Sequence, residues 1–230
     1  MKLVLFDIDG TLLTSSGAGR RAIIAALAAE MPVVQEWEQV RFDGKTDPQI
    51  LMELLAAAGH HEPPSPVRLS ELSQRYVSML RSELAQPAHR TTVLPGVREI
   101  LDEVESHDRT IMGLLTGNFV EGARLKLYSA GIDPDRFKVG AYGSDSAHRS
   151  ALPPIAAQRA QEFFGRVPTG QEVVIVGDTP SDVRCGECIG ARAIAVATGS
   201  YSVEELAAAG ASAVFPDLSD TTAVLEAILR

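Results

Sequence analysis

Short apolar runs alternate with helix-like segments along most of the chain. Residues 2–8 form the first run, and further runs predict strands over residues 110–116, 137–142, 172–177, 192–197 and 213–215. Apolar residues at helical spacing predict helices over residues 97–106, 119–130, 154–164, 181–190, 203–209 and 220–229. Such alternation favours parallel pairing, because each helix carries the chain back to the same end of the sheet. The pattern therefore predicts an α/β fold, with a Rossmann-like parallel sheet flanked by helices.

Residues 15–91 show a different pattern. Their apolar residues keep helical spacing, and none of their runs predicts a convincing strand. For the middle helix of this region, Asp47 and Pro48 are the expected N-cap and first-turn proline. We therefore expect an inserted helical domain over residues 15–91 and an α/β domain formed by residues 1–14 and 92–230.

The composition narrows the possible partners. The 230 residues carry a formal net charge of −9 at pH 7, and the pI is near 5.1. Nucleic acid and anionic membranes repel such a surface, so we expect neither as a partner. No apolar stretch approaches the ~20 residues that span a bilayer. A strand already begins at residue 2, so we expect no secretory signal and a cytoplasmic protein. The sequence does not determine the oligomeric state.

The two cysteines, Cys185 and Cys188, have a C-x-x-C spacing. This spacing occurs in redox pairs and in halves of zinc sites, but no second pair or histidine partner follows. Both lie in the helix predicted over residues 181–190. We therefore interpret them as small apolar side chains buried on one face of that helix.

Two carboxylates follow the first predicted strand. Asp7 and Asp9 are one residue apart, so an extended chain points both to the same side at the carboxyl edge of the sheet. Neighbouring carboxylates repel each other, and a hard cation such as Mg²⁺ is a suitable neutraliser. Gly10 lets the backbone approach a ligand, and Thr11 offers an amide and a hydroxyl to anionic oxygens. These residues predict a metal site, and the alternative is an acidic surface turn.

Two further predicted strands also end in polar clusters. One ends in Thr116, Gly117 and Asn118, which can bind the oxygens of a phosphoryl group. Another is followed by Asp178 and, four residues later, by Asp182. Open parallel sheets bind ligands at the carboxyl ends of their strands, so the three clusters favour a binding site over a surface turn.

These motifs resemble those of the haloacid dehalogenase (HAD)-type hydrolases, in the branch of magnesium-dependent phosphatases similar to phosphoglycolate phosphatase. The segment from Asp7 to Leu12 matches the first motif of that family. Residues 116–118 match the second motif, and residues 177–182 match the acidic fourth. The resemblance spans nearly the whole chain, and it implies that the helical insert is a cap domain.

The third motif of the family departs from its usual form in this chain. It is normally a lysine, but residues 143–154 contain none. Arg149 is the expected substitute, because it precedes a predicted helix as the lysine would and stays charged while it pairs with carboxylate or phosphate. The alternative is that Arg149 is a surface residue and Lys138 takes the role.

The resemblance also implies a role for each matched residue. Asp7 is expected to attack phosphorus and form an aspartyl-phosphate, and Asp9 to act as general acid and base. Asp178 is expected to bind Mg²⁺ with the Asp7 carboxylate and the Asp9 backbone carbonyl. Asp182 is expected to support these ligands from behind. The groups expected to bind the substrate belong to Thr116, Asn118 and Arg149, with Gly10, Thr11 and Gly117 beside them.

A loop of the expected cap contains a candidate for substrate selection. The segment from Phe42 to Asp47 resembles the substrate loop of the family and includes Lys45. We hypothesise that Lys45, helped by Arg41 or Arg20, contacts the part of the substrate distal to the phosphate. The alternative is a solvated loop that caps a helix.

The resemblance implies a Mg²⁺-dependent phosphatase that acts on a small phosphate monoester, such as a phosphoglycolate-like compound or a sugar phosphate. A phosphomutase would use the same Asp7 and Asp9. A haloacid dehalogenase is less favoured, because such relatives usually lack the second acid and need no metal. A non-catalytic phosphometabolite-binding protein would require that Arg149 has disabled catalysis.

Overall fold

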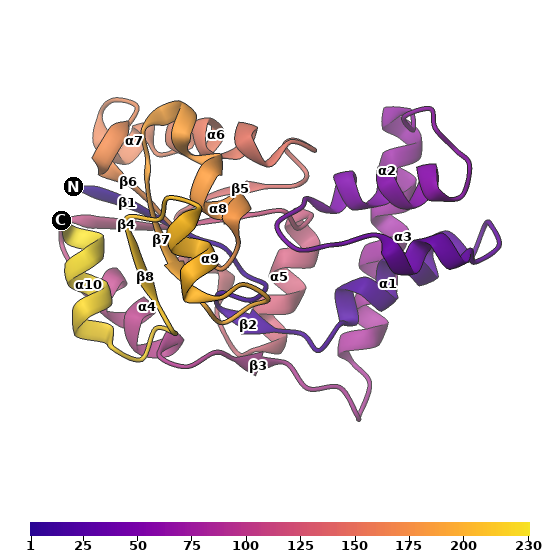
Figure 1. Cartoon of the computed structure of the whole chain (residues 1–230), viewed down its shortest axis with the longest axis horizontal. Helices are drawn as coiled ribbons and strands as arrows, with labels where there is room; N and C mark the ends of the chain where they lie inside the picture. The colour runs from indigo at the N-terminus through magenta and orange to yellow at the C-terminus, as the bar shows by residue number, and fades with distance from the viewer.

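The computed structural model describes all 230 residues and contains a six-stranded parallel sheet (Figure 1). The order of the strands is β5-β4-β1-β6-β7-β8, and every neighbouring pair is parallel. The strands are β1 (Lys2–Phe6), β4 (Thr110–Thr116), β5 (Val139–Tyr142), β6 (Val173–Gly177), β7 (Arg192–Val196) and β8 (Ala213–Phe215). The predicted α/β fold with a parallel sheet is therefore confirmed.

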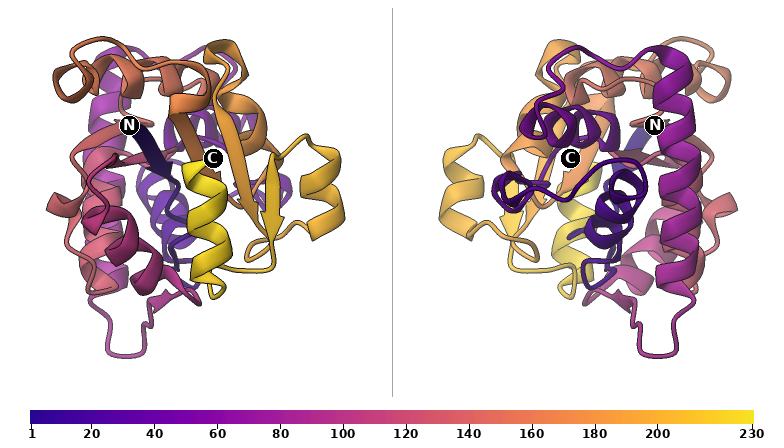
Figure 2. Two further views of the ribbon diagram at one scale, coloured as in Figure 1. Left: turned by 90° about the vertical axis from the view of Figure 1, so that its left-hand side faces the viewer. Right: turned by 90° about the vertical axis from the view of Figure 1, so that its right-hand side faces the viewer.

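Helices cover both faces of this sheet (Figures 1 and 2). One face is covered by α4 (Val97–Ser106), α5 (Val120–Ser129) and α10 (Thr221–Leu229). The other is covered by α6 (Leu152–Arg159), α7 (Gln161–Phe164), α8 (Pro180–Cys185) and α9 (Val203–Ala208). Alternate residues of β1 serve the two layers: Leu3 and Leu5 pack in one apolar cluster, and Val4 and Phe6 pack in the other. The central strand is thus buried on both sides, as its continuous apolar run requires.

Two of the predicted helices are shorter than expected. The helix predicted over residues 154–164 is divided into α6 and α7. The helix predicted over residues 181–190 ends at Cys185, and the 3₁₀ helix η5 (Glu187–Ile189) follows it. The other 3₁₀ helices in the sheet unit are η2 (Pro134–Arg136), η3 (Arg149–Ala151) and η4 (Gly170–Glu172). Because the chain leaves α8 early, Cys185 is buried but Cys188 is exposed, so the expected burial of both thiols was wrong for Cys188.

A separate helical unit lies at the opposite end of the molecule from the two termini (Figure 1). It consists of α1 (Ala18–Ala28), the 3₁₀ helix η1 (Gln35–Gln39), α2 (Asp47–Ala57) and α3 (Pro66–Leu84). These helices share their own apolar cluster, in which Trp37 and Tyr76 are fully buried. Phe119, which follows β4, joins the same cluster and so links the helical unit to the sheet. No helix in the structure combines the length and the apolar composition that a membrane crossing needs.

A two-stranded antiparallel ribbon connects the helical unit to the sheet. It pairs β2 (Leu13–Thr14), where the chain enters the unit, with β3 (Thr92–Val93), where it leaves. The sequence did not predict this ribbon, because two residues are too few to show an alternating pattern. The entry and the exit of the helical unit therefore lie side by side.

The start of α2 differs by one residue from the expectation. The N-cap is Thr46 rather than Asp47, and the Thr46 hydroxyl accepts a hydrogen bond from the backbone N–H of Gln49 at 3.2 Å. The Asp47 carboxylate accepts a bond from the backbone N–H of Phe119 instead, at 2.8 Å. Asp47 thus joins the helical unit to the segment that follows β4.

Candidate functional site

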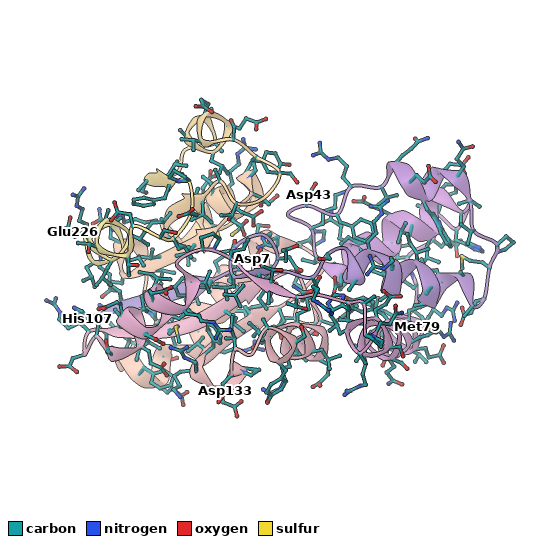
Figure 3. The ribbon with its side chains drawn as sticks, turned by 90° about the horizontal axis from the view of Figure 1, so that it is seen from below. Asp7, Asp43, Met79, His107, Asp133 and Glu226 are labelled. Carbon is teal, nitrogen blue, oxygen red and sulfur yellow. The ribbon has the colours of Figure 1, made fainter.

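The carboxylates of Asp7 and Asp9 lie at the carboxyl end of β1. The Asp7 backbone N–H donates to the carbonyl of Val176 at 2.9 Å, which continues the strand pairing up to the site. Gly10 then adopts a φ of +84°, which turns the chain away from the sheet. Asp7 is buried, whereas 41% of the Asp9 side chain is exposed. Figure 3 places Asp7 in the middle of the molecule, between the sheet and the helical unit.

A cluster of three buried acids surrounds this strand end. One carboxylate oxygen each from Asp7, Asp178 and Asp182 lie within 4.8 Å of one another. The hydroxyl of Thr11 donates to Asp178 at 3.0 Å. Asp182 is held at the start of α8, where it accepts hydrogen bonds from the backbone N–H and the hydroxyl of Thr179, at 3.0 and 2.7 Å. The structure therefore brings together acids from the first and fourth motifs.

Arg149 is the cation of this acidic cluster. Its guanidinium lies 3.1 Å from Asp7 and also donates a hydrogen bond to Asp182. Only 8% of the residue is exposed, so Arg149 is no surface residue. Lys138 is exposed and donates to the backbone carbonyl of Asp135. Of the two candidates for the third motif, only Arg149 reaches the acids.

Arg149 alone does not supply enough positive charge for the acidic cluster. Burial, together with repulsion from Asp182 and Asp9, raises the pKa of Asp7 to about 6, although Arg149 opposes this shift. Burial and repulsion from Asp182 and Asp7 raise the pKa of Asp178 well above its usual value. Burial opposes the charged form of Arg149, but the attraction of Asp182 and Asp7 outweighs it and raises the guanidinium pKa. One arginine therefore does not balance the three acids.

The residues of this cluster fit a hard divalent cation. The converging side chains offer oxygen ligands, as Mg²⁺ prefers. The raised pKa values of Asp7 and Asp178 show that another positive charge would favour the ionised forms of these two acids. Glycines leave room at the same point: a Cβ at Gly10 or at Gly199 would lie 2.3 or 1.9 Å from a carboxylate oxygen of Asp178. Side chains at these positions would fill the space around the acids.

The end of β4 contributes a hydrogen-bonded network. The amide nitrogen of Asn118 donates to the Thr116 hydroxyl at 2.7 Å and to the Asp9 carboxylate at 2.8 Å. Lys126 donates to the amide oxygen of Asn118 and to the same carboxylate oxygen of Asp9, both at 2.6 Å. The structure thus joins the second motif to Asp9 through a lysine.

Lys126 is a site residue that the sequence analysis missed. It is only 4% exposed, although it belongs to a helix on the face of the sheet. Burial disfavours its charge, but the attraction of Asp9 and Asp47 more than compensates and raises its pKa. The sequence does carry a signal, because Ala123, Lys126, Leu127 and Ala130 share one face of α5, where a charged residue interrupts an apolar stripe.

A loop of the helical unit packs directly on the second motif. The backbone N–H of Asp47 donates to the carbonyl of Gly117 at 2.7 Å, and the Thr46 hydroxyl donates to the carbonyl of Ala147 at 2.7 Å. A Cβ at Gly117 would lie only 2.2 Å from the carbonyl oxygen of Lys45. Only glycine allows the loop to approach this closely.

A cavity of about 260 Å³ lies between this loop and the sheet. Lys45 lines it and forms an ion pair with Glu53 at 2.5 Å. Arg20 also lines it, but its guanidinium donates to the backbone carbonyls of residues 37, 38 and 40 and stacks over the Phe42 ring, 4.5 Å from the centroid. Arg41 is exposed and lies 3.6 Å from Asp43. The predicted site residues Asp7, Asp9, Gly10, Thr116, Gly117, Asn118, Arg149 and Asp178 line the cavity as well.

Comparison with known proteins shows the family. The family described as haloacid dehalogenase-like hydrolase matches residues 1–190. The chain belongs to this hydrolase family. It is 30% identical over 192 residues to a phosphoglycolate phosphatase of Cereibacter sphaeroides, covering 82% of each chain. It is 29% identical over 223 residues to a phosphoglycolate phosphatase of Pseudomonas savastanoi pv. phaseolicola, covering 94% of this chain and 77% of that one.

Solved structures of similar fold support the architecture of this HAD-like hydrolase. A hydrolase from Pseudomonas syringae has a TM-score of 0.73 at 22% identity, with 98% of each chain covered. CbbY from Rhodobacter sphaeroides, in complex with phosphate, has a TM-score of 0.71 at 19% identity, with 96% of each covered. A β-phosphoglucomutase from Clostridium difficile has a TM-score of 0.72 at 17% identity, with 99% of this chain and 96% of that one covered. The predictions of the family and of a hydrolytic enzyme are therefore confirmed.

Replacing Gly117 by alanine should destabilise this hydrolase. The new Cβ would meet the backbone of Lys45, which cannot move without lifting the loop, so we expect Gly117→Ala to lower the free energy of unfolding by about 1–3 kcal/mol. The control is Gly122→Ala, because that Cβ would meet no atom closer than 3.5 Å and should stabilise α5 by about 0.5–1 kcal/mol. Urea denaturation measures the free energy of unfolding of both variants. Equal changes of this free energy in the two variants would contradict the close approach of the Lys45 backbone to Gly117.

Replacing Asp47 by asparagine should change the pH dependence of stability. Burial raises the pKa of Asp47 to about 6 from 3.8, so the fold favours its neutral form and loses stability as the pH rises through this interval. Asparagine is neutral throughout and can still accept the bond from Phe119. We expect Asp47→Asn to exceed the wild type by about 3 kcal/mol in free energy of unfolding at pH 8.

The same difference should fall towards zero as the pH approaches 4. Chemical denaturation at several pH values measures it, with Asp108→Asn at an exposed position as the control. A difference that does not vary with pH would show that Asp47 keeps an ordinary pKa in the fold.

Proposed function

We propose that the protein is a Mg²⁺-dependent phosphatase that hydrolyses a small phosphate monoester through an aspartyl-phosphate on Asp7. The observation that supports this most is the buried cluster of Asp7, Asp178 and Asp182 at a strand end, paired with Arg149 and open to a cavity. Phosphoryl transfer depends mainly on positioning and on charge neutralisation, and such a cluster can supply both.

Asp7 is the nucleophile of the proposed reaction. Its carboxylate oxygen bonds to phosphorus while the bond from phosphorus to the ester oxygen breaks. Arg149 contacts Oδ1 of Asp7, which fixes the orientation of the carboxylate before the attack. The product of this step is an acyl phosphate, which water hydrolyses readily.

Asp9 is the general acid and base. In the first step its carboxyl proton passes to the departing ester oxygen, and in the second step its carboxylate takes a proton from the attacking water. The water oxygen bonds to phosphorus as the bond to Asp7 breaks, which releases inorganic phosphate. The partial exposure of Asp9 suits this role, because both the leaving group and the water must reach it.

The remaining residues bind the ion and the phosphoryl group. Asp7, the backbone carbonyl of Asp9 and Asp178 would hold Mg²⁺, and Asp182 would support them from behind. The ion would neutralise charge on the phosphoryl oxygens. The hydroxyl of Thr116, the backbone amide N–H of Asn118 and the guanidinium of Arg149 would donate to the same oxygens, so that an acidic site does not repel its substrate.

The size of the cavity supports a small substrate. Its volume of about 260 Å³ lies below the range of roughly 300–1,000 Å³ that is typical of pockets for drug-sized ligands. Two relatives are phosphoglycolate phosphatases, and one structural neighbour was solved with phosphate. We therefore propose a phosphoglycolate-like compound or a sugar phosphate as the substrate.

A phosphomutase is the second candidate, because a neighbour of similar fold is a β-phosphoglucomutase. A mutase returns the phosphoryl group to the substrate, so it isomerises sugar phosphates and releases little inorganic phosphate. Phosphate release therefore separates the two candidates.

Replacing Asp7 by asparagine should abolish turnover. We expect the wild type with Mg²⁺ to release phosphate from at least one small monoester, and EDTA to stop the release. Asp7→Asn should lower kcat by at least about 10⁴-fold, because the amide cannot form the covalent intermediate. An assay of released inorganic phosphate measures the activity of the wild type with Mg²⁺, of the wild type with EDTA and of Asp7→Asn.

Asp108→Asn is the matched control and should keep full activity, because Asp108 is exposed and lies before the amino end of β4, whereas the site is at the carboxyl end. Retained activity in Asp7→Asn would refute the assigned nucleophile. Activity that persists in EDTA would refute the assigned metal.

Replacing Lys45 by alanine should weaken substrate binding. If the Lys45 ammonium leaves Glu53 to contact the distal part of the substrate, Lys45→Ala raises KM by about 10-fold, equal to about 1.4 kcal/mol, and leaves kcat nearly unchanged. Steady-state kinetics with the best substrate measure this, and the exposed Lys138→Ala is the control. An unchanged KM would remove Lys45 from the binding site.

A further inference from the structure

Lys126 is a buried cation that belongs to none of the four motifs. Its ammonium donates to Asp9 Oδ2 and to Asn118 Oδ1, both at 2.6 Å. Of the three acids of the proposed metal site, Asp7 and Asp182 pair with Arg149 instead. The cationic groups of the site are therefore divided, with Arg149 on the nucleophile and Lys126 on the general acid and base.

The hydrogen bonds around Lys126 have a fixed direction. An ammonium only donates, so the atom of Asn118 that faces Lys126 must be the amide oxygen. The amide nitrogen then donates to Thr116 Oγ1 at 2.7 Å and to Asp9 Oδ2 at 2.8 Å. Because Thr116 accepts this bond, its own hydroxyl proton is left for another acceptor. The orientation of Lys126 thus determines that of Asn118 and Thr116.

The surroundings of Lys126 keep its ammonium in place. The side chain is 6% exposed, so it cannot swing into solvent as surface lysines do. Two helices of the helical unit close over it: a Cβ at Gly19 of α1 would lie 3.3 Å from the Lys126 nitrogen and 3.7 Å from the Tyr76 hydroxyl of α3. A larger residue than glycine at position 19 would press on the ammonium.

Asp9 depends on this fixed group, because 41% of its side chain is exposed and its only two side-chain partners are Lys126 and Asn118. Both bind the same oxygen, Oδ2, so Oδ1 has no side-chain partner, and Asp9 lines the cavity. Without Lys126, one of the two bonds disappears and the Asn118 amide is free to turn, which weakens the other.

We propose that Lys126 is a positioning residue that holds the carboxyl group of Asp9 towards the ester oxygen of the substrate. This inference rests on the proposed phosphatase function and adds a requirement to it. The Lys126 ammonium itself transfers no proton. Its effect is to keep one oxygen of Asp9 bound, so that the other delivers the proton to the leaving group.

The proposal separates substrates by their leaving groups. An alkyl phosphate releases a strongly basic alkoxide and needs the proton from Asp9, whereas p-nitrophenyl phosphate releases a stable phenolate and hardly needs it. A residue that positions Asp9 therefore matters for the first substrate and little for the second. A residue that only maintains the fold affects both equally.

The test compares Lys126→Met with the wild type on both substrates. Methionine is unbranched like lysine and only one heavy atom shorter, and it suits the buried face of α5, so we expect the variant to fold. For an alkyl phosphate monoester, kcat should fall by about 10²-fold or more, and for p-nitrophenyl phosphate by less than about 3-fold. The exposed Lys138→Met should match the wild type on both substrates.

A second variant, Lys126→Gln, keeps a donor without the charge and should recover part of the alkyl phosphate activity. Equal losses on the two substrates, or no loss, would overturn the proposal. Failure of both variants to fold, seen by circular dichroism, would assign Lys126 to the structure alone and would also overturn it. A wild type inactive on every phosphate ester would instead refute the proposed function, so the two failures are distinguishable.

Discussion

Repulsion among carboxylates at one end of the sheet is the constraint on which the site depends. Asp7, Asp178 and Asp182 are buried within 4.8 Å of one another, where water screens their charges poorly. Burial and mutual repulsion raise the pKa values of Asp7 and Asp178, so the protein must supply positive charge or accept protonated acids. Arg149 supplies part of that charge. The unbalanced remainder makes the cluster receptive to a cation and, through it, to an anionic substrate.

The fold satisfies this constraint by taking acids and cations from different elements. The acids follow β1 and β6, neighbouring strands in the centre of the sheet, whereas Arg149 belongs to η3 and Lys126 to α5, on opposite faces. The two cations therefore reach the strand ends from both layers. Each element alone carries an uncompensated buried charge, which is costly. The charged site is thus complete only when the sheet and both helical layers are packed.

The sequence predicts a site residue well when local backbone geometry alone determines where its side chain lies. Asp7, Asp9 and Asp178 end apolar runs, and the direction of a strand end is set by local geometry, so the sequence located them. Lys126 lies ten residues beyond Thr116 on a helix, and its approach to Asp9 depends on how α5 packs on the sheet. The sequence predicts Asp47 as the N-cap of α2, but the structure has Thr46 there, and the sequence does not separate the two because both residue types can cap a helix. Only tertiary packing shows that Asp47 instead binds the backbone of Phe119.

The contact between the helical unit and the sheet places the loop that carries Lys45 against the segment that follows β4. The loop that carries Lys45 is held by the backbone N–H of Asp47, which donates to the carbonyl of Gly117, and by the hydroxyl of Thr46, which donates to the carbonyl of Ala147. The side chain of Lys45 takes part in neither contact. Within the helical unit, Arg20 donates to a backbone carbonyl, and Glu53 forms the ion pair with Lys45. A change of the Lys45 side chain therefore leaves the anchors of the loop in place, together with the hydrogen bonds among Asp9, Asn118 and Lys126. The charged groups at the sheet edge and the side chain of Lys45 are thus held by separate contacts.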